Sequence, residues 1–289
     1  MLYLKSFELP DVSFVERYLN GISARCIYND YPFTLFLGRG MERIEFAPIT
    51  IFCGGNGCGK TTLLNVIAEN LRLKRESAIS RSALFSDYAT ACKSSTCFGG
   101  IPDGSRIIAS DDVFDFMLNL RAFNEGVDLN RERLFDEYRR AKRNDEGFQL
   151  GSLADFEALK RMNEARSLTM SKYVNKRNPP NIRGRSNGES AYNYFASNIT
   201  DNALYLLDEP ENSLSAEFQL ELLQHLENAV RFFDCQLIIS THSPFLLSLR
   251  DAKIYEMDAE PVRTASFSSL KNVRTYYDFF KTNEARFKD

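Results

Sequence analysis

The sequence predicts an α/β fold with a parallel β-sheet at its centre, an antiparallel β-layer at its N-terminus and a helical insertion. Three observations support this prediction. Residues 49–71 indicate a buried strand, a glycine-rich loop and an amphipathic helix; residues 203–240 alternate strand, helix and strand; residues 112–176 are richly charged with a helical period. We expect a single domain over residues 1–289, with the insertion at about 112–185.

The composition is that of an ordinary globular protein, with 44% hydrophobic and 26% charged residues. A formal net charge of −3 gives no global attraction to nucleic acid or anionic membranes, so such a contact would need a local patch. No apolar run approaches the roughly 18–20 residues that span a bilayer. The N-terminus does not have the pattern of a signal peptide. We therefore expect a cytoplasmic protein whose six scattered cysteines are free thiols.

The N-terminal layer is predicted from short apolar, β-branched or aromatic runs that Gly, Pro and Asn separate. These runs are Met1–Phe7, Arg25–Tyr28, Phe33–Leu37 and Ile44–Phe46. Ser, Thr and Gly are common from Glu76 to Ser105, so we expect loops and short elements there.

The stretch GGNGCGKT fits the phosphate-loop pattern GxxxxGK[ST] and lies between a predicted strand and a predicted helix. Its glycines let backbone N–H groups and the positive helix end point at phosphate. We expect Lys60 to reach the β- and γ-phosphates and Thr61 to bind Mg²⁺; the alternative is a chance glycine-rich turn. The predicted nucleotide-binding residues of this stretch are Gly54, Gly55, Asn56, Gly57, Cys58, Gly59, Lys60, Thr61 and Thr62.

Two apolar strands end in polar residues farther along the chain. LYLLD ends at Asp208, which places a metal-binding carboxylate at the edge of the sheet, and Glu209 is then a candidate general base. The alternative is a pair of solvated acids before Pro210. LIISTHSP contains His242, which could contact a γ-phosphate or the attacking water, or could be a structural histidine. His225, on a helical face, is expected to be structural.

The stretch SNGES supports two interpretations. Ser186 and Glu189 have the spacing of a capping box, in which both side chains satisfy free N–H groups at a helix start. The four stretches GGNGCGKTT, SNGES, LYLLDEPENSLS and STHSP, in this order, resemble the Walker A, signature, Walker B with D-loop, and H-loop motifs of ABC-type ATPases. The resemblance is to soluble RecF-like and SMC-like members, often labelled AAA-family ATP-binding proteins.

The resemblance implies a P-loop NTPase fold of ABC-ATPase type and an ATP-dependent homodimer that sandwiches two ATP molecules. The signature residues of one subunit would then contact the ATP of the other, which is compatible with the capping box because helix N-termini bind phosphate. The sequence departs from the family pattern in two places. Between Leu71 and Asp112 no residue matches the glutamine of the loop that links ATP to the partner domain, and Asp111 or Asp112 is a candidate near the metal. The D-loop ends in Ser215, where an aspartate is common. The implied signature contacts are Ser186, Asn187, Gly188 and Glu189; the catalytic residues are Glu209, His242 and Lys60; the Mg²⁺ ligands are Thr61 and Asp208.

We therefore expect an enzyme that hydrolyses ATP with Mg²⁺, and a role in DNA repair or anti-phage defence is the leading hypothesis. A regulatory ATP switch that binds a protein partner is the alternative, and a transporter ATPase subunit is a third. The stretch Ser171–Arg185 could contact nucleic acid or be a solvated loop, since it has no acidic residue and five basic ones: Lys172, Lys176, Arg177, Arg183 and Arg185. We also expect the helix end and Lys60 to lower the pKa of the Cys58 thiol, and alkylation of Cys58 to block the ATPase.

Overall fold

The computed structural model describes residues 1–22, 30–77, 84–97, 99–143, 155–182 and 186–287 of the chain. The chain divides into two compact units. The first consists of Met1–Phe114 and Asn187–Asp289, and the second of Asp115–Ser186. The organisation as one ATPase domain with an insertion at about 112–185 stays a prediction.

The first unit contains a six-stranded, mostly parallel sheet in which β3 lies between β7 and β8. Its neighbouring strands pair in parallel, except that β9 is antiparallel to β8. Every residue of the three central strands is buried, as expected for a sheet covered on both faces. In sheet order the strands are β5 (Arg106–Ala109), β6 (Leu204–Asp208), β7 (Gln236–Ser240), β3 (Ile49–Cys53), β8 (Lys253–Glu256) and β9 (Arg263–Ala265).

A three-stranded antiparallel sheet forms the predicted layer. Its order is β2-β1-β4, with β1 at Leu4–Glu8, β2 at Arg43–Glu45 and β4 at Lys93–Thr96. The strand predicted at Phe33–Leu37 is wrong, because those residues form turns that bury two aromatic rings three positions apart, whereas a strand would bury every second residue. The strand predicted at Arg25–Tyr28 lies outside the described residues.

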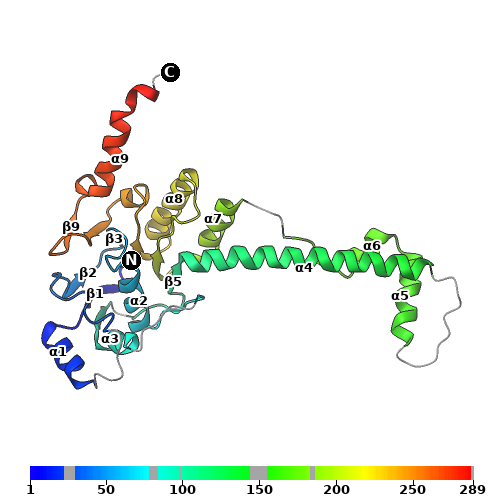
Figure 1. Cartoon of the computed structure of the whole chain (residues 1–289), viewed down its shortest axis with the longest axis horizontal. Helices are drawn as coiled ribbons and strands as arrows, with labels where there is room; N and C mark the ends of the chain where they lie inside the picture. Colours follow the sequence, from blue (N-terminus) through cyan, green and yellow to red (C-terminus); the bar gives the residue numbers. More distant parts are fainter. Residues whose placement is uncertain (23–29, 78–83, 98, 144–154, 183–185, 288–289) are drawn as a thin grey trace. The chain divides into compact units, whose positions relative to one another are not determined.

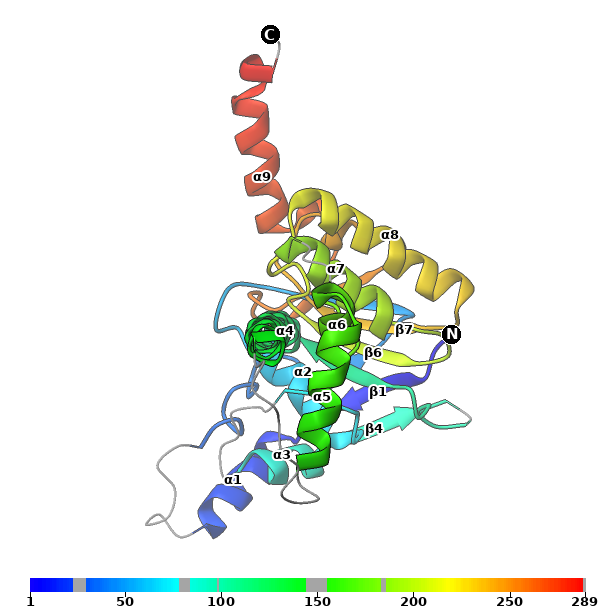
Figure 2. The ribbon, with the colours of Figure 1, turned by 90° about the vertical axis from the view of Figure 1, so that its right-hand side faces the viewer.

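Helices cover both faces of the parallel sheet. Figure 2 shows α7 and α8 on the side of β6 and β7 that faces away from α2 and β1. One helix lies where none was predicted: α1, which the Asp11 side chain caps. The seven-residue α3 is a short element in the region expected to hold loops and short elements. The helices of this unit are α1 (Val12–Gly21), α2 (Lys60–Asn70), α3 (Phe85–Ala91), α7 (Asn187–Asn198), α8 (Ala216–Phe232) and α9 (Lys271–Thr282), with 3₁₀ turns η1 (Leu246–Ser248), η2 (Phe267–Ser269) and η3 (Glu284–Phe287).

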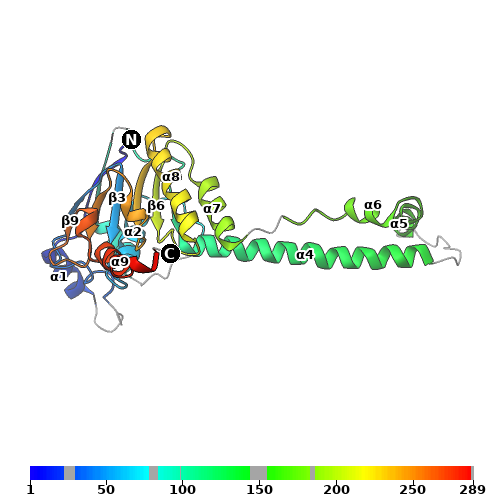
Figure 3. The ribbon, with the colours of Figure 1, turned by 90° about the horizontal axis from the view of Figure 1, so that it is seen from above.

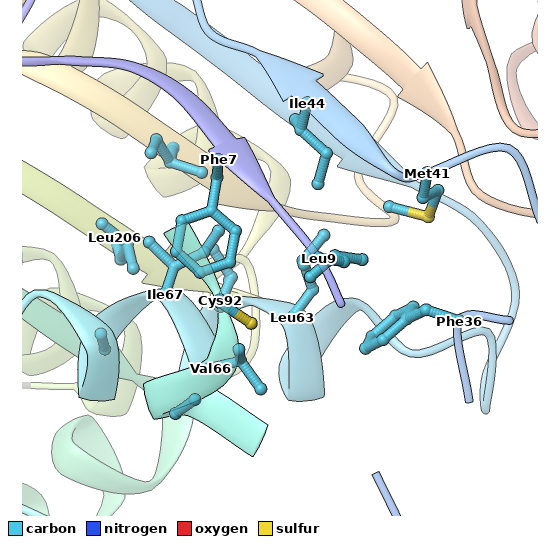
Figure 4. Packing of buried hydrophobic residues seen from close by; sticks show 14 of the residues in the cluster. Phe7, Leu9, Phe36, Met41, Ile44, Leu63, Val66, Ile67, Cys92 and Leu206 are labelled. Atoms are coloured by element: carbon cyan, nitrogen blue, oxygen red, sulfur yellow. The ribbon is translucent and has the colours of Figure 1, made fainter. Parts of the chain in front are cut away.

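The main hydrophobic core lies between the two sheets and α2. Figure 4 shows Phe7 of β1, Ile67 of α2 and Leu206 of β6 gathered in this core, and all three are fully buried. Gln236 at the start of β7 joins the sheets. Its side chain accepts hydrogen bonds from the N–H groups of Tyr3 (2.7 Å) and Leu4 (2.8 Å) and donates to the carbonyl groups of Leu4 (2.9 Å) and Ala47 (3.2 Å).

The second unit is helical. Most of α4 (Ser110–Arg143) belongs to it, and α4 is one continuous helix in Figure 1. Helices α5 (Asp155–Ser167) and α6 (Met170–Asn175) complete the unit. A small core joins them to α4, consisting of Leu134, Tyr138, Ala165, Tyr173 and Val174. The prediction of an α/β fold with an antiparallel layer and a helical segment is therefore confirmed. No helix in the described ranges is both long and apolar enough to cross a membrane.

Candidate functional site

The glycine-rich loop connects the buried strand β3 to α2, as predicted. Gly59 precedes α2 with φ of 99°, a conformation that favours glycine, and a Cβ atom there would meet Cε1 of Phe36 at 3.0 Å. No side chain among the described residues caps α2. The N–H groups of its first turn therefore point out of the helix start, where they suit an anion.

Lys60 is the buried cation of this loop, with 4% of its surface exposed. Its Nζ donates to the carbonyl groups of Gly54 (3.0 Å) and Gly55 (3.1 Å). The same Nζ lies 2.8 Å from Nε2 of His242 and 3.9 Å from Oε1 of Glu209. The fold thus brings together three side chains from three separate motifs. Figure 3 shows the strands β3 and β6, and Lys60 and Glu209 follow these two strands in the sequence.

Asp208 ends β6 and is buried. Its Oδ1 accepts hydrogen bonds from Thr61 Oγ1 at 3.1 Å and from Ser240 Oγ of the neighbouring strand. Burial raises the pKa of this carboxyl, against the opposing effect of the two hydrogen bonds. A buried carboxylate beside a threonine hydroxyl is a set of hard oxygen ligands that fits Mg²⁺, because the cation would offset the cost of burying the negative charge.

Glu209 and His242 lie side by side at the ends of β6 and β7. Nε2 of His242 is 3.3 Å from Oε1 of Glu209, and Oε2 of Glu209 accepts a hydrogen bond from Asn212 at 3.2 Å. Glu209 has φ of 46°, in the left-handed region, and its N–H donates to the carbonyl of Ser240 at 3.0 Å. About a third of each side chain is exposed, 29% for Glu209 and 33% for His242, so both groups are accessible to a bound water or substrate.

A pocket of about 480 Å³ opens beside the phosphate loop. Tyr31 stands in it, and its hydroxyl forms a 2.7 Å hydrogen bond with Oγ1 of Thr62. Sequence reasoning did not assign Tyr31, since it lies far from every motif. The residues that line the pocket are Tyr31, Leu35, Asn56, Gly57, Gly59, Lys60, Thr61, Thr62 and Glu209.

Two residues outside the phosphate loop, which the sequence did not indicate, form hydrogen bonds with the backbone of the loop. The N–H of Gly55 donates to both carboxylate oxygens of Asp258, at 2.9 and 2.7 Å. Arg39 donates to the carbonyl groups of Cys58 (2.8 Å) and Met257 (2.6 Å) and so joins the loop to the segment after β8. Neither Arg39 nor Asp258 belongs to a recognisable local pattern, which explains why sequence reasoning missed them.

Cys58 contradicts the prediction made for it. The thiol is buried, and burial raises its pKa above the ordinary value, although Lys60 acts in the opposite direction. The sequence indicates a nearby cation and a helix end but not the loss of water around the sulfur, which is the larger effect here. The predicted lowering of the Cys58 pKa is therefore wrong, whereas the predicted effect of its alkylation on the ATPase stays a prediction.

The signature stretch lies at the start of α7. Gly188 is in the first turn of this helix, and a Cβ atom there would meet Cδ2 of Phe218 in α8 at 2.9 Å. Tyr192 of α7 stacks on the same ring, with centroids 6.1 Å apart. Glycine at position 188 therefore allows the close approach of α7 to α8. The capping box of Ser186 and Glu189 stays a prediction.

Of the two acidic candidates in the first turn of α4, Asp112 holds backbone N–H groups. Asp112 is buried, and its two carboxylate oxygens accept hydrogen bonds from the N–H groups of Ser77 and Ala109, both at 2.6 Å. The contact with Ala109 satisfies a backbone donor at the start of α4, and the contact with Ser77 satisfies one in a segment distant in sequence. His225 is partly buried, and burial lowers its pKa, consistent with the structural role expected for it.

Comparisons with known proteins give two family matches. The model described as ABC transporter matches residues 43–212, and the model described as AAA ATPase domain matches residues 187–247. A comparison with curated proteins gives no match.

Two solved structures illustrate the similarity. One is the Smc head domain with an extended coiled coil, bound to the C-terminal domain of ScpA, derived from Pyrococcus furiosus. It is 14% identical, covers 96% of this chain and 100% of its own, and has a TM-score of 0.43. The other is a dimeric, post-hydrolysis state of the ATP-binding cassette MJ0796 bound to ADP and Pi. It is 15% identical, covers 93% and 100%, and has a TM-score of 0.37.

Proposed function

Because the chain belongs to the ABC-type ATPase family, whose model matches residues 43–212 and so more than half of its length, we propose that it binds and hydrolyses ATP. Family membership confirms the predicted P-loop fold of ABC-ATPase type. The observation that carries the proposal is the convergence of Lys60, Glu209 and His242 at one sheet edge, with 2.8 Å between Lys60 and His242 and 3.3 Å between His242 and Glu209.

Each side chain has a distinct task in this proposal. Lys60 compensates the charge of the β- and γ-phosphates, and Thr61 and Asp208 would hold Mg²⁺, which supplies charge neutralisation on the phosphate oxygens. Glu209 accepts a proton from the attacking water, and His242 orients the water or the γ-phosphate. Tyr31, the aromatic residue of the pocket, offers its ring to the adenine base.

The ATPase acts as a homodimer with composite sites. The support for this is the family resemblance of the SNGES stretch, from which Ser186, Asn187, Gly188 and Glu189 of one subunit contact the ATP held by the other. The partial exposure of Glu209 and His242 is compatible with a site that a second copy completes. ATP binding then favours the closed dimer, and hydrolysis releases it.

A protein partner is better supported than nucleic acid as the target of this ATPase. In the basic stretch, Lys176 and Arg177 both pair with Glu164, which neutralises part of the local charge. Arg183 and Arg185 lie outside the described residues. The second unit also exposes large apolar side chains, which favour protein contacts. These side chains are Leu118, Phe123, Leu129 and Phe156.

A Glu209→Gln variant tests the proposal. The amide accepts hydrogen bonds but takes no proton at neutral pH, so ATP binding should persist while hydrolysis slows on the order of 10²-fold. Light scattering should show ATP-dependent dimers that persist, and Glu221→Gln on the exposed face of α8 is the matched control. Normal turnover of Glu209→Gln, or a monomer at saturating ATP, would contradict the proposal.

A further inference from the structure

The backbone of His242 is held by side chains on both sides. Its N–H donates to Oε1 of Glu211 at 2.6 Å, and the N–H of Ser243 donates to the same oxygen at 3.1 Å. Its carbonyl accepts a hydrogen bond from Nδ2 of Asn272 at 2.6 Å. Glu211 follows β6 and Asn272 lies in the first turn of α9, so two segments remote in sequence meet at the backbone of one residue.

The segment that carries His242 is irregular. β7 ends at Ser240, and residues 241–243 belong to neither a helix nor a strand. Regular hydrogen bonding therefore does not fix the His242 peptide, and the direction in which its imidazole leaves the backbone depends on the side chains that hold it. That ring lies between Lys60 and Glu209, where a small displacement changes both distances.

We propose that Glu211 and Asn272 are positioning residues that set the orientation of the His242 ring toward Lys60 and Glu209. The inference rests on the proposed ATPase function and deepens it. Glu211 offers one carboxyl oxygen to two backbone N–H groups, so removing that side chain removes two hydrogen bonds at once. Asn272 supplies the donor for the carbonyl on the opposite side and thereby connects the start of α9 to the catalytic edge of the sheet.

The chemistry of the two contacts predicts which replacements restore function. Glu211→Gln keeps an oxygen that accepts from both N–H groups, whereas Glu211→Ala removes it. Asn272→Ala removes the donor, and Asn272→Asp presents an acceptor to the His242 carbonyl. Because misplacement of a catalytic group by about 1 Å costs on the order of 10²-fold in rate, Glu211→Ala, Asn272→Ala and Asn272→Asp should each lower kcat by about 10- to 100-fold. ATP affinity should change by less than about 2-fold, and Glu211→Gln should recover most of the loss.

A double-mutant cycle distinguishes positioning from a general loss of structure. If Glu211 acts through His242, Glu211→Ala should have almost no further effect on kcat in a His242→Ala background. A merely structural role would give effects that multiply. Independent effects of the two replacements, or an unchanged kcat in both Glu211→Ala and Asn272→Ala, would overturn the proposal.

A second readout needs no ATP. The chain contains only two histidines, so side-chain nitrogen NMR of nucleotide-free protein gives two sets of imidazole signals, which a His225→Gln variant assigns. Glu211→Ala and Asn272→Ala should move or broaden the His242 set and leave the His225 set unchanged. Glu221→Ala, exposed on α8, is the control. Unmoved His242 signals in both variants would refute positioning.

With two variants, Glu211→Ala and Asn272→Ala, the test remains decisive if one of them misfolds or if the proposed ATPase function is wrong. Thermal unfolding checks each protein, and if Glu211→Ala does not fold, Asn272→Ala on the partly exposed side of α9 decides the question. If the wild-type protein does not hydrolyse ATP, the proposed function fails, whereas the NMR comparison still shows whether Glu211 and Asn272 orient His242.

Discussion

Gln236 links the two sheets, so its replacement should lower the free energy of unfolding. The side chain is fully buried and makes four hydrogen bonds of 2.7–3.2 Å, which join β7 of the parallel sheet to β1 and to the carbonyl of Ala47. At about 0.5–1.5 kcal/mol for each bond, and with buried backbone groups left unpaired, Gln236→Ala should lower the free energy of unfolding by about 3–5 kcal/mol. Few single substitutions have larger effects.

The assay is urea unfolding followed by far-ultraviolet circular dichroism, since the chain has no tryptophan. Gln224→Ala on the exposed face of α8 is the matched control and should change the free energy of unfolding by less than about 0.5 kcal/mol. A loss below about 1 kcal/mol for Gln236→Ala would refute the reasoning.

A Gln236→Glu variant adds a test that depends on pH. Gln236→Glu keeps an acceptor for the N–H groups of Tyr3 and Leu4 but directs a second acceptor at two carbonyl groups. It should destabilise the protein at pH 7 at least as much as Gln236→Ala. Burial next to two carbonyl oxygens disfavours the charged form and so raises the folded-state pKa of the introduced carboxyl above its unfolded value. The deficit relative to wild type should therefore shrink as the pH falls toward 5 and the carboxyl takes up a proton.

Three further outcomes follow from the site. Lys60→Ala should lose ATP binding, measured by calorimetry, because the phosphate charge is left uncompensated; unchanged affinity would refute the nucleotide site. Asp112→Ala should lower the free energy of unfolding by about 2–4 kcal/mol and leave the Mg²⁺ dependence of turnover unchanged, since both its oxygens hold backbone N–H groups; a raised Mg²⁺ requirement would restore it as a metal candidate. Because burial raises the pKa of Cys58, its thiolate should stay scarce until the pH exceeds the ordinary value of 9.0, and alkylation at pH 7.5, followed by mass spectrometry, should modify the more exposed Cys97 first; rapid modification of Cys58 would contradict this.

Local patterns in the sequence predicted much of the site and of the fold. The phosphate loop, the strand that ends at Asp208 and the strand before His242 each combine an apolar run with polar residues at its end, and parallel strands bring such ends to one edge. The apolar run at residues 33–37 predicts a strand although it forms turns, because a short apolar run does not by itself distinguish the two.

The remaining features depend on contacts between distant segments. Asp258, Arg39 and Asn272 belong to no local motif, yet each holds part of the site through a hydrogen bond to a backbone group more than 15 residues away in sequence. The pKa of Cys58 also required the structure, because burial cannot be read from neighbouring residues. The sequence therefore indicates the candidate reacting groups, whose roles stay predictions, but not the residues that hold them.

The central claim is that two copies of the chain share each ATP site. Mixing the Ser186→Arg protein with the Lys60→Ala protein tests it directly, because a mixed dimer places both lesions in one site and leaves the other intact. Each variant alone should be inactive, and the mixture should recover ATP hydrolysis up to about half of the wild-type rate per mixed dimer if the sites act independently. ATP-driven association of the two variants is measured alongside. Normal hydrolysis by Ser186→Arg alone, with neither recovery nor association on mixing, would contradict the claim.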